Sequence, residues 1–462
     1  DLTAGPVGRT LLVFSLPIVL QMSIQPLFGI VDRIFIGHLG PDAFNAVTNA
    51  GVVMMLVINL SAGLANGVTS YVARLVGRGE YQEADNAAVH SMLVMLVFSI
   101  AFIAVFYPFD RAFFQMLGMQ PGPLELAHQF IKVIVLGNIT IMFSLVGANV
   151  LRGEGDSRTP LTLAVVSVAV NVVVAPVLIF RPEDALFGFH PGWLGMGVSG
   201  GSWATVIGRG VGCILLIAYL LRGRNVWTFT LKNFRWTPRH LVEILRVGLP
   251  MLLVNLTTTL AALVFLRVLN SAPLAVVAYG IGTQLDMIAI LPMIGLTVGM
   301  VAMVGQNYGA GRLDRARRAS WLGGVYAAGF SGVMGVAAIA FPDFWVGLFD
   351  PTGDPEIRRL SVQYIYIVGL SYAFVAQVFV LGGAFQGLGQ GMPPLIITGV
   401  RFILVAIPLA LVLSPEIGPT GAFIAVAASH MIGGVMAVAW LAVELHRVRR
   451  REEKRRASSV KD

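Results

Sequence analysis

An aspartate lies near the end of the first long apolar stretch of the sequence. The spacing of Gln21, Gln25, Phe28 and Asp32 places them on one stripe of a helix, together with Pro17. A charge near the centre of a bilayer costs roughly 2.5–3.5 kcal/mol on insertion scales. We therefore expect the stripe to face the protein interior or a wet cavity, where a carboxylate can take up a proton or a cation. The alternative is that Asp32 is solvated at the helix end.

A second acid lies well inside a later apolar stretch. Tyr279, Thr283 and Asp286 are spaced i, i+4 and i+7, so they share one helix face. An ionisable residue at this depth is by default a candidate functional group. The alternative is a purely structural acid, held by hydrogen bonds or by an arginine within a helix.

Other polar groups inside apolar stretches give weaker evidence. For an isolated amide or hydroxyl, a hydrogen bond between helices is the expected role; the residues concerned are Asn171, Ser202, Thr205, Arg209, Arg401 and His430. Pro17 and Pro26 interrupt the first stretch. Pro26 makes this helix a candidate for bending during a functional cycle, and a static kink is the alternative.

The elements that must position these residues are membrane-spanning helices. Hydrophobic residues make up 56% of the chain and charged residues only 12%, which is typical of a polytopic membrane protein. Twelve stretches reach the length of about 20 residues that a bilayer requires. They lie near 10–36, 46–74, 87–107, 125–150, 160–181, 197–221, 242–269, 274–304, 319–341, 360–385, 393–413 and 419–442.

The distribution of positive charge predicts the orientation. Arginine and lysine gather in one set of loops, including Arg74 and Arg152, and in the C-terminal segment RVRRREEKRR. Such loops are cytoplasmic in membrane proteins, so we expect both termini in the cytoplasm. The same asymmetry accounts for the net charge of +8 without a nucleic-acid partner, and we expect the C-terminal cluster to meet anionic lipid headgroups.

Three sequence matches indicate an internal duplication. SLPIVLQMS and GLPMLLVNL place Pro17 and Pro250 at equivalent positions, 233 residues apart. VGRGEYQEADNAA recurs as YGAGRLDRARRAS, and LRGEGDSRTPL recurs as FQGLGQGMPPL, at offsets of 232 and 234. The sequence therefore predicts an all-α polytopic membrane protein with twelve transmembrane helices in two pseudo-symmetric six-helix bundles.

This organisation favours a transporter that works by alternating access. We expect an N-lobe at 1–221, a cytoplasmic linker at 222–241, a C-lobe at 242–442 and a basic cytoplasmic tail at 443–462. Parallel repeats of this kind can rock about a site between them. The chain lacks P-loop and HExxH motifs, and Cys213 is its single cysteine, so we expect a secondary transporter without cofactor rather than an enzyme.

The duplicated layout, DRIFIGHLG at 32–40, LRGEGDSRTP at 151–160 and FQGLGQG at 385–391 resemble the multidrug and toxic compound extrusion (MATE) family of the MOP superfamily. Within it, the sequence is similar to the prokaryotic DNA-damage-inducible F branch. The resemblance implies a multi-pass protein of a prokaryotic plasma (inner) membrane, which we expect to be monomeric. It also implies export of cationic amphipathic drugs in exchange for protons or sodium ions.

The resemblance further implies an ion-coupling cluster at Asp32, Asn171 and Thr205. A second acid of that cluster would fall at Ala175. Without it the site is poor in ligands for sodium, whereas a lone shielded carboxyl group is suited to binding a proton. We therefore favour H+ as coupling ion and keep Na+ as the alternative, with Asp286 as a possible compensating acid. Two alternative functions remain. One is a lipid-linked oligosaccharide flippase, which Arg209 and Arg401 support, and the other is a channel or non-transporting membrane protein.

Overall fold

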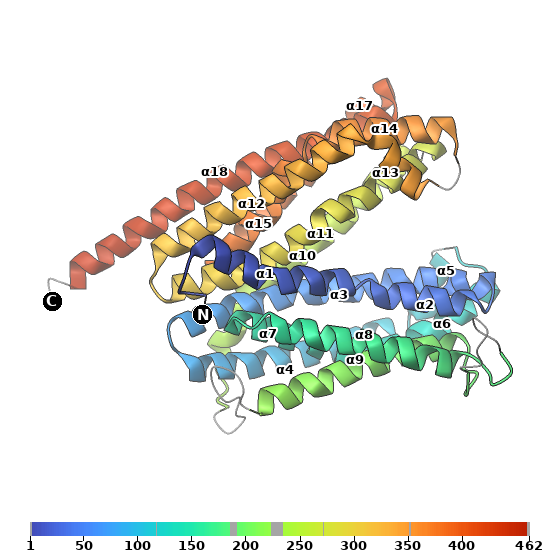
Figure 1. Ribbon diagram of the computed structural model, residues 1–462, viewed down its shortest axis with the longest axis horizontal. Coiled ribbons are helices and arrows are strands. Elements are labelled where there is room, and N and C mark those ends of the chain that lie inside the picture. Colours follow the sequence, from blue (N-terminus) through green and yellow to red (C-terminus); the bar gives the residue numbers. More distant parts are fainter. Residues whose placement is uncertain are drawn as a thin grey trace. The chain divides into compact units, whose positions relative to one another are not determined.

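The computed structural model describes residues 2–116, 118–184, 192–222, 234–270, 272–350 and 353–459. Within this part of the chain every regular element is helical (Figure 1). The helices of the first half are α1 (Val7–Ile24), α2 (Leu27–Gly37), α3 (Pro41–Gly77), α4 (Tyr81–Phe106), α5 (Asp110–Met116), α6 (Pro121–Leu136), α7 (Asn138–Glu154), α8 (Arg158–Ile179) and α9 (Val198–Leu221).

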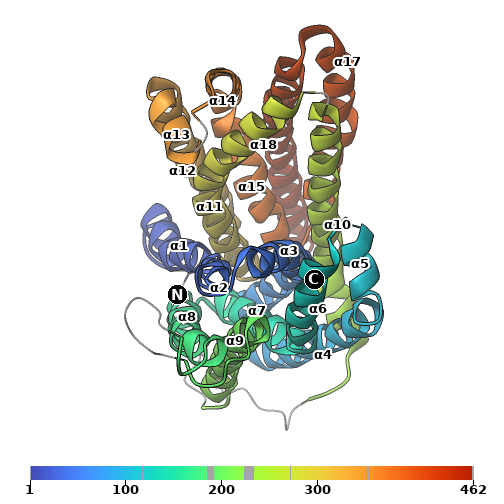
Figure 2. The same cartoon turned by 90° about the vertical axis from the view of Figure 1, so that its right-hand side faces the viewer.

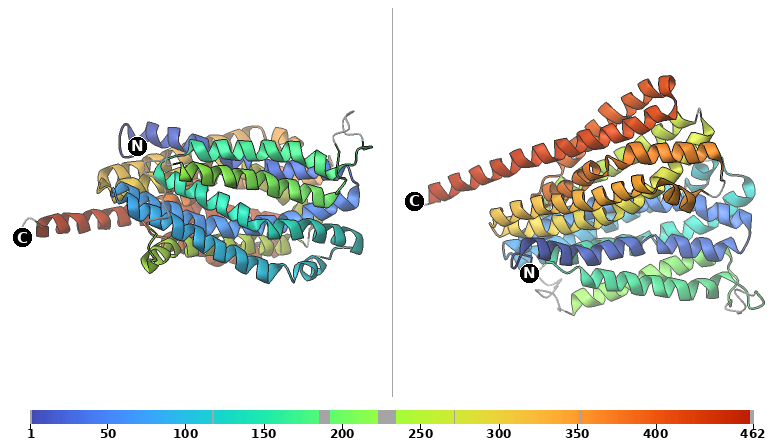
Figure 3. Two further views of the ribbon diagram at one scale, coloured as in Figure 1. Left: turned by 90° about the horizontal axis from the view of Figure 1, so that it is seen from below. Right: turned by 45° about the horizontal axis from the view of Figure 1, so that its top comes forward.

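The second half repeats this arrangement with further breaks. Its elements are α10 (Pro238–Leu269), α11 (Pro273–Gly309), α12 (Leu313–Ala340), α13 (Pro342–Phe349), α14 (Pro355–Gly369), α15 (Tyr372–Gly387), α16 (Met392–Gly399), the π-helix η2 (Val400–Ala406), α17 (Ile407–Ile417) and α18 (Pro419–Ser459). Figure 3 shows α18 as one long helix. It runs through the segment for which the sequence predicts a separate tail.

The helices account for the predicted membrane spans. Ten helices of the described chain are long and apolar enough to cross a bilayer, where α1 with α2 counts as one helix and α16 with η2 and α17 counts as another. Two further spans are bent pairs, α6 with α7 at 48° and α14 with α15 at 54°. The total of up to twelve agrees with the prediction, and the protein is an all-α multi-pass membrane protein.

Contacts between residues divide the chain into two compact units. The first-half unit comprises Leu20–Val72 and Glu80–Ile244, and the second-half unit comprises Asp1–Val19, Ala73–Gly79 and Leu245–Asp462. The start of α1 and the end of α3 thus belong to the second-half unit, although the predicted N-lobe includes them. The boundaries given above for the N-lobe, the linker, the C-lobe and the tail stay predictions.

The sequence repeat is visible in how helices end. Gly155 closes α7 with φ 99°, and Gly389, 234 residues later, follows α15 with φ 81°. The next amide in each case bonds back to the last turn: Asp156 N donates to Leu151 O and Gln390 N to Phe385 O. This is the glycine-terminated helix end in which a left-handed residue satisfies the last carbonyls. Each copy of the repeated segment therefore folds into the same turn.

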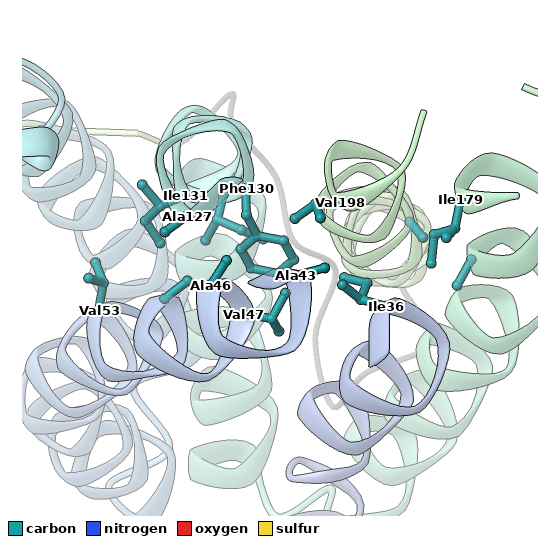
Figure 4. Packing of buried hydrophobic residues seen from close by; sticks show 14 of the residues in the cluster. Ile36, Ala43, Ala46, Val47, Val53, Ala127, Phe130, Ile131, Ile179 and Val198 are labelled. Carbon is teal, nitrogen blue, oxygen red and sulfur yellow. The ribbon is translucent and has the colours of Figure 1, made fainter. Parts of the chain in front are cut away.

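A shared apolar core fixes how the helices of the first-half unit pack. Figure 4 shows Ile36 of α2, Val47 of α3, Phe130 of α6, Ile179 of α8 and Val198 of α9 in this apolar cluster. Their burial in a shared core fixes the rotation of each helix about its axis. In the second-half unit, α11 and α12 pack on α15, and α15 packs on α18 (Figure 2).

Small residues bring α8 and α9 close together. A Cβ atom on Gly208 would lie 2.7 Å from the Ser167 carbonyl oxygen and 3.1 Å from Asn171 Cβ. Only glycine fits at such a helix crossing, because any side chain would push the two backbones apart. The approach brings the middle of α8 against the middle of α9.

Two arginines assigned to cytoplasmic loops are in fact buried. Arg74 and Arg152 are 5% and 1% exposed, because α3 and α7 continue past the apolar stretches that define their spans. Both residues therefore lie within helices and not in loops. Part of the predicted linker is also folded: Thr237 N donates to His90 Nε2, and the buried His240 lies in α10.

Replacement of Gly208 by alanine should destabilise the protein, since the new methyl group meets backbone that cannot move independently. Overpacking of this kind costs about 1–3 kcal/mol. Gly210→Ala is the matched control, because its Cβ meets nothing within 4 Å and alanine favours the helix by about 1 kcal/mol. Thermal unfolding of the purified proteins, followed by tryptophan fluorescence, should show a lower Tm for Gly208→Ala only; equal Tm values would contradict the close approach.

Candidate functional site

Asp32 is buried between three helices of the first-half unit. It lies on α2, which packs on α8 and α9, and it is 1% exposed. Thr205 Oγ1 lies 3.2 Å from Asp32 Oδ1 and 3.1 Å from Oδ2, and donates to the carboxylate. Asn171 Nδ2 in turn donates to Thr205 Oγ1 over 3.2 Å. The structure thus brings the three residues of the predicted ion-coupling cluster into one hydrogen-bonded chain.

The fourth position of this cluster carries no charge. Ala175 lies one turn beyond Asn171 on α8 and is fully buried. Asn171 Oδ1 is buried and has no hydrogen-bond partner among the described residues. One carboxylate, one hydroxyl and one amide oxygen are therefore the oxygen atoms that the cluster can offer to a cation. The described residues contain no group of three or more His, Cys, Asp or Glu that could hold a metal ion.

Asp286 of α11 is held by two tyrosines in the second-half unit. Tyr364 Oη donates to Asp286 Oδ2 and Tyr372 Oη to Oδ1, each over 2.6 Å. Both tyrosines are buried, whereas Asp286 is half-buried. A carboxylate that accepts two short hydrogen bonds has a fixed orientation and keeps lone pairs for a further ligand.

The two tyrosines were missed in the sequence analysis. Tyr364 lies on α14 and Tyr372 on α15, on either side of the 54° bend in this span. Sequence spacing along a straight helix cannot show that both reach the same carboxylate of another helix. Of the predicted partners on α11, Tyr279 packs edge-to-face on Tyr364 with centroids 5.9 Å apart. Thr283 Oγ1 donates instead to Gly280 O of its own helix.

The predicted polar stripe of the first helix divides into two environments. Gln21, Gln25 and Phe28 line a cavity of about 190 Å³ in the first-half unit, but Asp32 is not among its described lining residues. The division follows a break, because α1 ends at Ile24, α2 begins at Leu27, and Pro26 lies between them. Pro17 lies inside α1.

Two buried arginines line the same cavity. Arg152 Nη2 donates to Gln21 Oε1 over 2.7 Å. The Arg209 guanidinium lies over the Phe28 ring, 4.2 Å from its centroid. No Asp or Glu is present among the described residues of the lining. Arg209 was predicted as a polar residue inside a helix. Arg152 was predicted in a loop, because hydropathy does not show how far α7 extends.

Of the remaining candidates, Arg401 and His430 lie in the second-half unit, and Ser202 lies in the first-half unit. Arg401 is buried in η2 with its guanidinium 4.6 Å from the centroid of the Phe402 ring. His430 of α18 is buried, and its Nδ1 lies 2.7 Å from Ser371 Oγ. Ser202 of α9 donates to Ser199 O of its own helix. The His430 contact joins α18 to the start of α15, as expected for an isolated polar group in a bundle, whereas the Ser202 hydrogen bond and the Arg401 ring contact stay within one helical segment.

Comparison with known proteins agrees with this architecture. The MatE family model matches twice, over residues 17–177 and 247–412. The probable multidrug resistance protein NorM of Thermotoga maritima is 27% identical over 90% of this chain and 88% of its own length. An FAD transporter of Shewanella oneidensis is 25% identical over 94% of each chain. A crystal structure of MATE in the bent conformation has a TM-score of 0.90, with 25% identity over 97% of this chain and 98% of that one. The chain belongs to the MATE family of multidrug efflux transporters, which are secondary transporters and not enzymes.

Proposed function

We propose that this protein is a proton-coupled antiporter that exports amphipathic organic compounds, including cationic drugs, by alternating access. The observation that carries the proposal is the burial of Asp32 beneath Thr205 and Asn171 in a membrane-spanning helix. A carboxyl group in such a place has no counter-ion at hydrogen-bond distance among the described residues. Taking up a proton removes a charge that burial disfavours.

Protonation of Asp32 would change the hydrogen bonds of its neighbours. As an anion Asp32 only accepts, whereas the protonated acid also donates. The Thr205 hydroxyl, which now donates to Asp32 and accepts from Asn171, would then have to reorient. Because Thr205 and Asn171 lie on two different helices, this change can favour a different arrangement of α2, α8 and α9. A proton moves the equilibrium between conformations by its different affinity for each, and the break at Pro26 is where α2 can move relative to α1.

Sodium is the alternative coupling ion. Its candidate ligands are the Asp32 carboxylate, Thr205 Oγ1 and Asn171 Oδ1. Hard cations take several oxygen ligands. Because residue 175 is an alanine, it supplies no second carboxylate. The set supports proton coupling better than sodium coupling. No cofactor is required in either cycle.

The acid of the second-half unit supports recognition of cationic groups. Asp286 is half-buried and accepts hydrogen bonds from Tyr364 and Tyr372, and the Tyr279 ring packs on that of Tyr364. Aromatic faces and a carboxylate attract organic ammonium ions. We infer that a cationic group of a substrate binds here. The oligosaccharide flippase is the less favoured function, since multidrug transporters are among the relatives that cover nine-tenths of this chain. A channel or non-transporting membrane protein is less favoured for the same reason.

We place the protein, as a monomer, in a prokaryotic plasma membrane with both termini in the cytoplasm. The excess of arginine in one set of loops supports this orientation. Similarity to the DNA-damage-inducible F branch supports the assignment of Asp32, Asn171 and Thr205 to ion coupling. Membrane lipid and organic substrates are the partners that this function requires, and nucleic acid is not.

Asp32→Asn should abolish drug efflux driven by a pH gradient, because the amide cannot exchange a proton near neutral pH. Efflux of a fluorescent organic cation from proteoliposomes is measured with pH and sodium gradients imposed separately. The wild type should respond to the pH gradient alone. Asp343→Asn, at an exposed ion pair with Arg358, should transport normally. Undiminished pH-driven efflux by Asp32→Asn would refute the role of Asp32. Efflux driven by a sodium gradient alone would identify sodium, and not the proton, as the coupling ion.

Thr205→Val should reduce the same pH-driven efflux, whereas Thr205→Ser should retain most of it. Valine keeps the shape of threonine but removes the hydroxyl that donates to Asp32. An unsatisfied buried acceptor costs about 1–3 kcal/mol, and this cost falls on the state in which Asp32 is ionised. Equal transport by the two variants would show that the hydroxyl is not needed.

Tyr364→Phe and Tyr372→Phe should each weaken binding of the organic cation, measured by equilibrium titration without a gradient. Each variant removes one donor that orients Asp286, worth roughly 1.5–3 kcal/mol for a hydrogen bond to a charged group. Tyr366→Phe is the matched control, because Tyr366 is exposed. If all three variants bind the cation alike, Asp286 is not the site of the cationic group.

A further inference from the structure

The cavity of the first-half unit is charged in a way that coupling through Asp32 does not explain. Its described lining contains Arg152 and Arg209, the amides of Gln21 and Gln25, apolar side chains such as Leu163 and Leu216, and no carboxylate. Both arginines are more than nine-tenths buried. Buried charges in membrane-spanning segments are costly and mark functional sites unless a partner neutralises them.

Neither arginine has such a partner among the described residues. A guanidinium has five N–H donors. Arg152 uses Nη2 on Gln21 and Nη1 on Asn149, the latter at 3.4 Å, and its Nε has no partner. Arg209 has the Phe28 ring on one face, and its Nε also has no partner. The Asp32 carboxylate accepts from Thr205 and forms no ion pair with Arg209 among the described residues. Each guanidinium group thus has unused N–H donors, and both arginines line the cavity.

The size of the cavity indicates what part of a molecule it can hold. About 190 Å³ is roughly six times the ~30 Å³ share of a water molecule, and less than the ~300–1,000 Å³ of pockets that enclose a whole drug-sized ligand. It therefore suits one end of an amphipathic molecule. The apolar walls can contact a ring or a short chain, and the guanidinium groups can bind the charged end.

We propose that this cavity binds the anionic end, a carboxylate or phosphate, of an amphipathic organic molecule through Arg152 and Arg209. Guanidinium groups are weakly hydrated and bind planar or tetrahedral oxyanions through two parallel hydrogen bonds. Gln21, which already holds Arg152, and Gln25 can add neutral hydrogen bonds. The site thus extends the proposed substrate range from cations to anions and zwitterions, and it is independent of which ion drives transport.

The test is equilibrium binding to the full chain in nanodiscs of zwitterionic lipid. Three probes share one ring system and differ in charge: 1-naphthoate, the neutral 1-naphthamide and the cationic 1-naphthylmethylammonium. Naphthoate should bind saturably and at least tenfold more tightly than the amide. Arg152→Gln and Arg209→Gln should each weaken naphthoate roughly tenfold or more, as expected for loss of a charge-assisted hydrogen bond. Arg209→Lys should keep part of the affinity.

Two controls separate charge from folding. Arg401→Gln removes another buried arginine that lies over a phenylalanine ring, in the second-half unit, and should leave naphthoate binding unchanged. Ala164→Phe keeps both charges but fills the cavity, to which Ala164 contributes, and should abolish binding. Each variant must keep the elution volume and the Tm of the wild type; if the glutamine variants do not, the comparison rests on Arg209→Lys and Ala164→Phe.

The source of the anion is distinguished by the lipid. Repeating the titration in nanodiscs with phosphatidylglycerol should leave naphthoate affinity unchanged if a soluble anion is the ligand. Competition by this lipid would show that the same site takes a lipid headgroup. The proposal is overturned if the three probes bind alike, or if the double variant Arg152→Gln/Arg209→Gln binds naphthoate as the wild type does. Because no gradient is used, these outcomes are independent of any failure of Asp32 to couple transport.

Discussion

The contact between α8 and α9 is the constraint on which the chemistry of the first-half unit depends. Gly208 lets the two backbones approach until Asn171 can donate to Thr205, and α2 then closes the space with Asp32. The carboxylate is shielded from water only while these three helices stay together. Any conformational change that separates α2 from α8 and α9 must therefore expose Asp32 or give it a proton. In the proposed cycle, helix packing therefore controls the proton occupancy of Asp32.

Sequence periodicity and hydropathy predicted the helical architecture well, because a span of about 20 apolar residues has few other stable arrangements in a bilayer. Asp32 was predicted from its period on the first helix, and Asn171 and Thr205 from a resemblance. Tyr364 and Tyr372 could not be predicted, since their shared contact with Asp286 depends on a bend and on long-range packing. Arg152 was misplaced because α7 carries its polar end into the protein interior rather than into a loop.

The two halves of the duplication now carry different chemistry at equivalent places. At the offset of 233 that relates Pro17 to Pro250, the counterpart of Asp32 is Phe265, which is buried and stacks on Tyr279. At the offset of 232 that relates the turns after α3 and α11, the counterpart of Asp286 is Met54, which packs against the core of the first-half unit. Each half thus carries its candidate functional acid on a different helix. The repeat preserves the turns that end its helices, whereas its charged groups have diverged with their roles.

The charges of the first-half unit make the protonation of Asp32 affect the binding of anionic and cationic substrates differently. While Asp32 is ionised, it offsets part of the positive charge of Arg152 and Arg209; once it is protonated, the cavity is more positive. Within one conformation, a proton on Asp32 and an anion in the cavity therefore favour each other, whereas a proton disfavours a cation nearby, and by linkage each effect is reciprocal. For a cation bound within the first-half unit, this repulsion supports the exchange of a proton for a cation that we propose. An anion needs no such exchange to leave a cell, because a membrane potential of 100 mV, negative inside, already contributes about 2.3 kcal/mol for each charge that crosses.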